Sequence, residues 1–301
     1  MRPAESAVRD AFLRACELDV ETQKPGNVSV DSAGHGMTAA QFIASAQAAA
    51  GALFVPGARV GTRILDAMTR TLEVAGCNTN LGIVLLVAPL AAALDDLAPP
   101  MNGREWRDAT ERVLARLTLD DARAAYRAIA LANPGGLGDA SEQSVHAEPS
   151  VDLRAAMALA ADRDSIARQY ANGFRDVFET GLSAVANAPA DTPKEITLDV
   201  FLSFLGGWPD SHIVRKQGVT VAQSVTGEAK RHRARWRATA AHAARQDATQ
   251  QLLAWDAGLK ARGINPGTSA DLTVATLFVA GCLDPARTGV AATRGCDWHG
   301  S

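Results

Sequence analysis

Along most of the chain, apolar residues recur at intervals of three and four, the spacing that places them on one face of an α-helix. Val8, Phe12 and Cys16 form one such stripe. Ala, Leu, Arg, Glu and Gln dominate these segments, and few windows show the alternating β-branched pattern of a strand. The spacing predicts helices over residues 4–22, 38–54, 59–75, 80–95, 104–117, 120–132, 151–182, 194–207, 219–262 and 269–282.

Segments rich in Gly, Pro and polar residues separate these stretches. They read "DSAGHGMT", "NPGGLGDASEQSVHAEPS", "NAPADTPKE" and "GWPDSH". None is long or polar enough for an interdomain linker, and no repeat of fixed period occurs. We therefore expect an all-α protein with a single multi-helix bundle domain over residues 1–285 and a C-terminal tail over 286–301. Its polar site is expected to be built from helix N-termini and loops.

Composition narrows the class of protein. The chain has 301 residues, 47% hydrophobic and 21% charged, which is typical of a globular protein. Its net charge of -3 gives no reason to expect nucleic acid or an anionic membrane as a partner. The longest apolar run, 81–94, is short for a bilayer span and contains Pro89, so it indicates a buried helix. The widely spaced cysteines and the absence of a secretory signal favour the cytoplasm.

Four breaks share one construction, a short Gly-, Pro- or Asn-containing segment directly before a predicted helix. They are "KPGNVS" (24–29), "CNTNLG" (77–82), "NPGGLG" (133–138) and "NPGTSADL" (265–272). Glycine allows close approach of the backbone, and the free N–H groups at a helix start favour an anion such as phosphate. The same residue types are also ordinary helix caps and turns. Neither a P-loop nor a Rossmann fingerprint is present.

Charged side chains gather in two other segments. In "AADRDSIARQYANGF", Asp164 and Arg168 are four residues apart, which suits either a surface ion pair or, with Asp162, a source of carboxylates for magnesium held mainly by substrate phosphates. In "GWPDSHIVRKQG", Asp210 could bind metal or act as a base, and Arg215 with Lys216 could grip phosphate, or all could simply cap a turn. The basic run "KRHRARWR" indicates a solvated helix face.

Taken in order, "ETQKPGNVS", "CNTNLG", "NPGGLG", "AADRDSIARQYANGF", "PDSHIVRKQG" and "NPGTSADL" resemble the triphosphoribosyl-dephospho-CoA synthase family, over about residues 4–280. The resemblance implies an all-helical transferase that breaks the N-glycosidic bond of ATP and releases adenine. It then joins the triphosphoribosyl group to a ribose hydroxyl of dephospho-CoA. ATP and dephospho-CoA are the partners implied, Mg²⁺ is expected with the nucleotide, and a homodimer is compatible with it.

The expected site residues come partly from the matched family motifs and partly from the loops and charged segments described above. We expect catalytic roles for Glu21, Asp164 and Asp210, and metal binding by Asp162, Asp164 and Asp210. Substrate and phosphate binding is expected from Lys24, Gly26, Asn27, His35, Asn78, Thr79, Asn80, Gly82, Arg163, Arg168, Arg215 and Lys216.

This chain also departs from the family pattern. Two of its segments resemble the motifs "KPGLVD" and "NTHKG" of the citrate-lyase branch. Where those motifs have an acid, a histidine and a lysine, this chain has Ser29, Asn80 and Leu81. The variant motifs resemble the branch associated with tetrahydromethanopterin-linked one-carbon metabolism. Two alternatives therefore stay open beside the transferase. One is a same-fold enzyme acting on another phosphorylated substrate in methanopterin- or methanofuran-type cofactor biosynthesis, and the other is an inactive nucleotide-binding scaffold.

Overall fold

The computed structural model describes residues 4–30, 38–133, 148–189, 192–238 and 242–290. Within these ranges the chain is all-α and contains no extended strand, as the hydrophobic spacing predicts. The elements are α1 (Glu5–Glu21), α2 (Ala39–Leu53), α3 (Val60–Ala75), α4 (Leu81–Ala93), η1 (Leu94–Asp96), α5 (Gly103–Ala115), α6 (Leu119–Ala132), α7 (Leu153–Ala158), α8 (Ser165–Asn172), the π-helix η2 (Asp176–Gly181), α9 (Leu182–Ala186), α10 (Pro193–Gly207), α11 (Ser211–Gln217), α12 (Val219–Ala238), α13 (His242–Ala261), α14 (Gly267–Leu283) and α15 (Pro285–Thr288).

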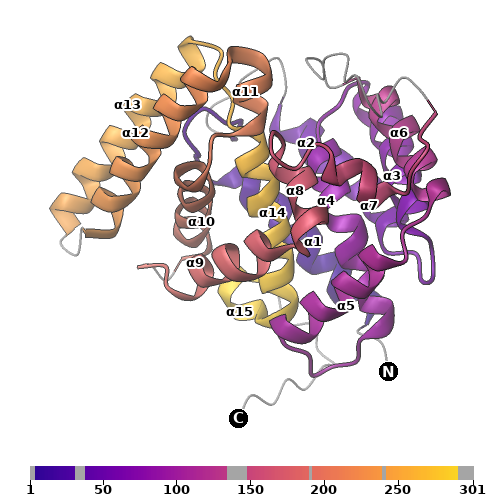
Figure 1. The fold of residues 1–301 in the computed structure, drawn as a ribbon. Helices are drawn as coiled ribbons and strands as arrows, with labels where there is room; N and C mark the ends of the chain where they lie inside the picture. The colour runs from indigo at the N-terminus through magenta and orange to yellow at the C-terminus, as the bar shows by residue number, and fades with distance from the viewer. Residues whose placement is uncertain (1–3, 31–37, 134–147, 190–191, 239–241, 291–301) are drawn as a thin grey trace.

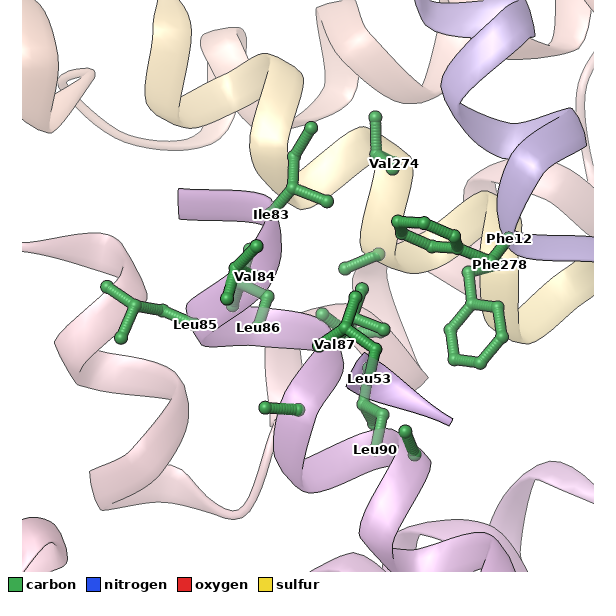
Figure 2. Close-up of a cluster of buried hydrophobic side chains, with 14 of the residues drawn as sticks. Phe12, Leu53, Ile83, Val84, Leu85, Leu86, Val87, Leu90, Val274 and Phe278 are labelled. Carbon is green, nitrogen blue, oxygen red and sulfur yellow. The ribbon is translucent and has the colours of Figure 1, made fainter. Parts of the chain in front are cut away.

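Helix α14 runs through the middle of the molecule (Figure 1). It contacts α1, α4, α8, α10 and α11, and its residues from Leu272 to Cys282 are buried on every side. A helix without a polar face belongs inside a protein. Figure 2 shows Val274 and Phe278 of α14 beside Phe12 of α1, with Val87 of α4 close by. The ring of Phe278 packs 6.2 Å from Phe12 and 5.6 Å from Trp106, centroid to centroid.

A second hydrophobic cluster joins α10 and α11 to the antiparallel pair α12 and α13, which lie side by side at one edge of the fold (Figure 1). The basic run of α12 takes part in this packing. Arg233 and Arg237 donate to the fully buried carboxylate of Asp199 on α10, at 3.1 and 2.6 Å, and Trp236 is buried. The expectation of a solvated face is therefore wrong for these three residues, because Asp199 pairs with the two arginines and Trp236 belongs to the hydrophobic cluster.

Two long helices expected from the sequence are interrupted. The range 151–182 divides into α7, α8, η2 and α9, because Asp164 adopts an extended backbone and caps α8, while Gly173 and Phe174 have φ of 67° and 57°. Local capping and left-handed backbone therefore override the continuous apolar spacing. The range 219–262 forms α12 and α13. Helix α11, expected to be a turn, begins where Asp210 supplies a cap.

Pro89 lies inside α4 and leaves one backbone acceptor without its helical donor. Proline has no N–H, so the carbonyl of Leu85 loses its usual partner four residues along. The hydroxyl of Tyr170 on α8 donates to that carbonyl at 2.7 Å, and Tyr170 is fully buried. A side chain of α8 thereby completes the hydrogen bonding of α4. Among the described helices none is long and apolar enough to cross a membrane.

We expect Tyr170→Phe to destabilise the fold by about 1–3 kcal/mol, because it leaves the buried carbonyl of Leu85 unpaired. Urea unfolding followed by circular dichroism measures the change. In a Pro89→Ala background, residue 89 regains an N–H that can reach Leu85, so the same substitution should cost less. Equal costs in the two backgrounds would contradict this account of the Tyr170 hydrogen bond.

Candidate functional site

The candidate site lies where the first turns of α4 and α14 meet. A Cβ built on Gly82 in α4 would overlap Oδ2 of Asp271 in α14 and lie 2.9 Å from Cδ1 of Ile166 in α8. The carboxylate of Asp271 thus occupies space that only glycine leaves open at position 82. The glycine of the "CNTNLG" motif and the acid of the "NPGTSADL" motif are therefore in direct contact.

Several charges surround Asp271. Burial raises its pKa well above the ordinary value, and the nearby carboxylates of Asp19, Asp210 and Asp164 act in the same direction. The guanidinium of Arg215 opposes them. Asp271 is consequently a group whose charged form is disfavoured and whose proton can exchange at higher pH than that of an exposed aspartate.

Asp164 joins α8 to α11. Its Oδ1 accepts from the backbone N–H groups of Ile166 and Ala167 at 2.8 and 3.1 Å, which caps α8. Its Oδ2 accepts from Arg215 at 2.7 Å. Two predicted site residues therefore come together, but as partners of each other.

Arg168 does not form the surface pair with Asp164 that their spacing allows. Its Nε donates to Oδ2 of Asp176 at 2.9 Å, and its guanidinium lies 4.4 Å from the centroid of the Trp208 ring. The reason is that Asp164, as the cap residue, turns its carboxylate back toward the helix start and across to α11. Arg168 instead joins α8 to the π-helix and to the end of α10.

Asp210 anchors α11 to the first turn of α14, the two helices that meet at one end of α14 in Figure 1. Its Oδ1 accepts from the N–H groups of His212 and Ile213 at 2.9 and 3.1 Å. Its Oδ2 accepts from the N–H and the hydroxyl of Ser269 at 2.7 and 2.8 Å. Burial raises the pKa of Asp210, and these hydrogen bonds oppose the rise. Both oxygens are fully engaged, which marks Asp210 as an anchor between helices.

Lys24 is fully buried against Asp19 at the end of α1. Its Nζ lies 3.1 Å from Oδ1 of Asp19 and also donates to the Asp19 backbone carbonyl. Burial lowers the pKa of Lys24 and raises that of Asp19, and their mutual attraction opposes both changes. The lysine expected to grip phosphate is thus held inside the protein by an acid.

The rest of the "KPGNVS" loop is bound to the C-terminal part of the chain. Gly26 has a φ of 80° and donates its N–H to Oδ1 of Asp256 at 2.7 Å. The amide of Asn27 donates to Oδ1 of Asn265 at 2.9 Å. A side chain at position 26 would meet the Ile264 carbonyl at 2.9 Å, so glycine is needed both for the backbone conformation and for the close approach.

The loop before α4 contains one polar side chain without a partner. Oδ1 of Asn78 accepts from the Leu81 N–H at 3.1 Å, and the Thr79 hydroxyl donates to Ser45 at 2.7 Å. Asn80 is only 4% exposed, and neither its amide nitrogen nor its amide oxygen has a hydrogen-bond partner among the described residues. Since buried polar groups are almost always paired, Asn80 indicates a place for a ligand.

Other predicted site residues are exposed or have partners outside this cluster. Glu21 pairs with Arg14 at 3.2 Å and with Lys194 at 3.9 Å. Asp162, Arg163 and Lys216 are exposed, and His35 falls outside the described residues. No three His, Cys, Asp or Glu side chains of the described residues are grouped so that they could hold a metal ion. The predicted set of Asp162, Asp164 and Asp210 therefore does not assemble a protein metal centre.

Asp271 and Asp19 are the site residues that the sequence reasoning missed. Asp271 lies within "NPGTSADL", a motif whose Asn, Pro and Gly predict an anion-binding helix start and say nothing of the acid. The available signal is a lone acid in a helix that is otherwise uncharged. A charge there requires a partner or a function.

We expect Asp271→Asn to stabilise the protein at alkaline pH. The raised pKa means that the folded state holds the Asp271 proton to higher pH than the unfolded chain does. Wild-type stability therefore falls as pH rises from the ordinary aspartate value through the raised folded value. Above that window the variant should be more stable by about 0.5–2 kcal/mol, and the gain should shrink as the pH is lowered.

Urea unfolding at about pH 8 and about pH 5 measures this difference. Asp66→Asn, at an exposed position of α3, serves as the matched control and should show little change at either pH. A variant of Asp271 that is less stable than wild type at the higher pH would contradict the burial cost assigned to this carboxyl.

Comparison with known proteins places the chain in a family. No curated protein matches it. The crystal structure of a proposed triphosphoribosyl-dephospho-CoA synthase from Archaeoglobus fulgidus superposes with a TM-score of 0.59, at 21% identity, covering 80% of this chain and 99% of that one, and so shares its fold. The family described as ATP:dephospho-CoA triphosphoribosyl transferase matches residues 5–288. Since that match spans nearly the whole sequence, the chain belongs to this family of transferases.

Proposed function

We propose that this protein transfers the triphosphoribosyl group of ATP to a hydroxyl group of an acceptor, dephospho-CoA in the reaction that names the family. The acceptor oxygen bonds to C1′ of the ribose, the C1′–N9 bond breaks, and the hydroxyl proton is transferred, in the net reaction, to the departing adenine. The supporting observation is the contact of Asp271 with Gly82 of the "CNTNLG" motif, beside Asp164 and Asp210 of two further motifs.

The chemistry of this transfer suits a partly buried carboxylate such as that of Asp271. As the glycosidic bond lengthens, positive charge develops at C1′ and the ring oxygen, and a nearby carboxylate stabilises it. Asp164 and Asp210 are each engaged by several protein donors, whereas Asp271 is not so engaged in the described part of the chain. Asp271 is therefore the carboxylate best suited to face the reacting sugar.

Phosphate groups require a different part of the site. The carboxylate of Asp271 lies against Gly82, so the start of α4 disfavours a phosphate, and the phosphates of the nucleotide lie outside this cluster. We propose that Mg²⁺, where it is used, enters with the nucleotide and is held mainly by phosphate oxygens, because the described side chains form no metal cage.

The charge of the cluster favours a second candidate, a related reaction on a different phosphorylated substrate. Asn80 and Leu81 are neutral. The citrate-lyase motif "NTHKG", which this segment resembles, has a histidine and a lysine at these two positions. The cations that remain, Lys24 and Arg215, are already paired with acids. A site with so little free positive charge would bind a free triphosphate weakly, which favours an acceptor or donor with fewer phosphates, such as a one-carbon cofactor precursor.

Incubation with ATP, Mg²⁺ and dephospho-CoA should release adenine in a one-to-one ratio with the triphosphoribosylated product, measured by chromatography and mass spectrometry. Adenine release only with another hydroxyl-bearing acceptor would favour the second candidate. Binding of ATP by calorimetry without any adenine release would instead indicate the inactive scaffold and contradict the proposed reaction.

Gly82→Ala should reduce the turnover rate by at least about 100-fold, because its methyl group would displace the carboxylate of Asp271 from the start of α4. Gly207→Ala is a matched control, since a Cβ at that position of α10 meets no atom within 4 Å. Both variants are compared by adenine release and by unfolding in urea. Full activity in a folded Gly82→Ala protein would contradict the role given to this contact.

A further inference from the structure

Asp271 differs from the other acids of its cluster in having no structural partner. Asp19 is 3.1 Å from Lys24, Asp164 is 2.7 Å from Arg215, and Asp210 accepts from Ser269 at 2.7 Å. No described residue donates a hydrogen bond to the Asp271 carboxylate. Its oxygens are therefore available to a ligand.

Asn80 supplies a second free group on the same turn of α4. It occupies the cap position yet makes no cap hydrogen bond, it is 4% exposed, and both amide atoms lack partners among the described residues. Leaving such a group unpaired is destabilising. Gly82, which Asp271 covers, follows two residues later. An unpaired carboxylate and an unpaired amide thus belong to one helix start.

The local charge determines which ligand group fits there. Among the described residues, Lys24 is paired with Asp19 and Arg215 with Asp164, so both of these cations are already engaged by acids of the cluster. A phosphate placed against Asp271 would add negative charge to a cluster that already lacks compensation. A hydroxyl group is neutral, donates to a carboxylate, and can both donate to and accept from an amide.

We propose that Asp271 and Asn80 form a hydroxyl-binding subsite that holds the vicinal hydroxyl pair of a ribose, with the phosphates of the ligand outside it. One carboxylate accepts from two neighbouring ribose hydroxyls, as acids do in dinucleotide-binding sites. The amide of Asn80 donates to one of the hydroxyl oxygens. The inference deepens the proposed function and rests on it for the identity of the ligand.

Two riboses qualify as the occupant, because ATP and dephospho-CoA both carry free 2′- and 3′-hydroxyls. The experiment separates them by measuring equilibrium binding of each ligand and of its 2′,3′-dideoxy analogue to the full-length protein by calorimetry, with Mg²⁺ present. Each binding measurement uses one ligand alone, so that no acceptor and donor react. Wild type is compared with Asp271→Ala, Asn80→Leu and the exposed control Asp66→Ala.

For the ligand whose ribose occupies the subsite, wild type and Asp66→Ala should lose about 10- to 100-fold in affinity when the hydroxyls are removed. Asp271→Ala should bind the natural ligand and its dideoxy analogue almost equally, and Asn80→Leu should show a reduced difference. A penalty for ATP alone assigns the donor ribose to the subsite, and a penalty for dephospho-CoA alone assigns the acceptor ribose.

The subsite is overturned if wild type shows no penalty with either ligand, if the penalty persists in Asp271→Ala, or if neither natural ligand binds. Circular dichroism establishes that each variant is folded. Failure of the proposed reaction has a different signature, which is a hydroxyl penalty that depends on Asp271 in a protein that releases no adenine.

Discussion

The burial of α14 on all sides is the constraint that organises this protein. An apolar helix surrounded by α1, α4, α8, α10 and α11 leaves no room for polar chemistry along its length, so such chemistry is confined to its ends. The polar contacts lie at the N-terminal end of α14, where Ser269 donates to Asp210 and Asp271 contacts Gly82. The core and the candidate site are therefore two consequences of the same packing.

Most of the charged residues at that end hold helices in place. Asp164 and Asp210 each cap one helix and bind a group from another, and Lys24 neutralises Asp19 in the interior. Such fully bonded acids are poor candidates for chemistry, because an acceptor with filled positions has little left to offer a substrate. Asp271, which has no such partners among the described residues, is the acid that we propose to face the ligand.

Hydrophobic spacing was sufficient to predict the long helices, because a helix with one buried face carries its own periodic signal. It failed at 151–182, where capping by Asp164 and the left-handed backbone at Gly173 decide the path, and these are local hydrogen-bond effects. The motifs "CNTNLG", "PDSHIVRKQG" and "NPGTSADL" located segments that meet at the site, whereas "NPGGLG" lies outside the described residues from position 134 on. They did not reveal that Lys24 and Arg215 are each paired with an acid. Lys24 is paired with Asp19 inside the folded protein, and Arg215 is paired with Asp164, which is 51 residues away in sequence.

The hydrogen bond from Tyr170 to Leu85 has a mechanical consequence for the site. It fixes the position of α8, whose first turn Asp164 caps, relative to α4, which carries Gly82. A substitution that breaks this hydrogen bond would therefore act on the site from a distance, because the Asp164–Arg215 ion pair would shift relative to Gly82.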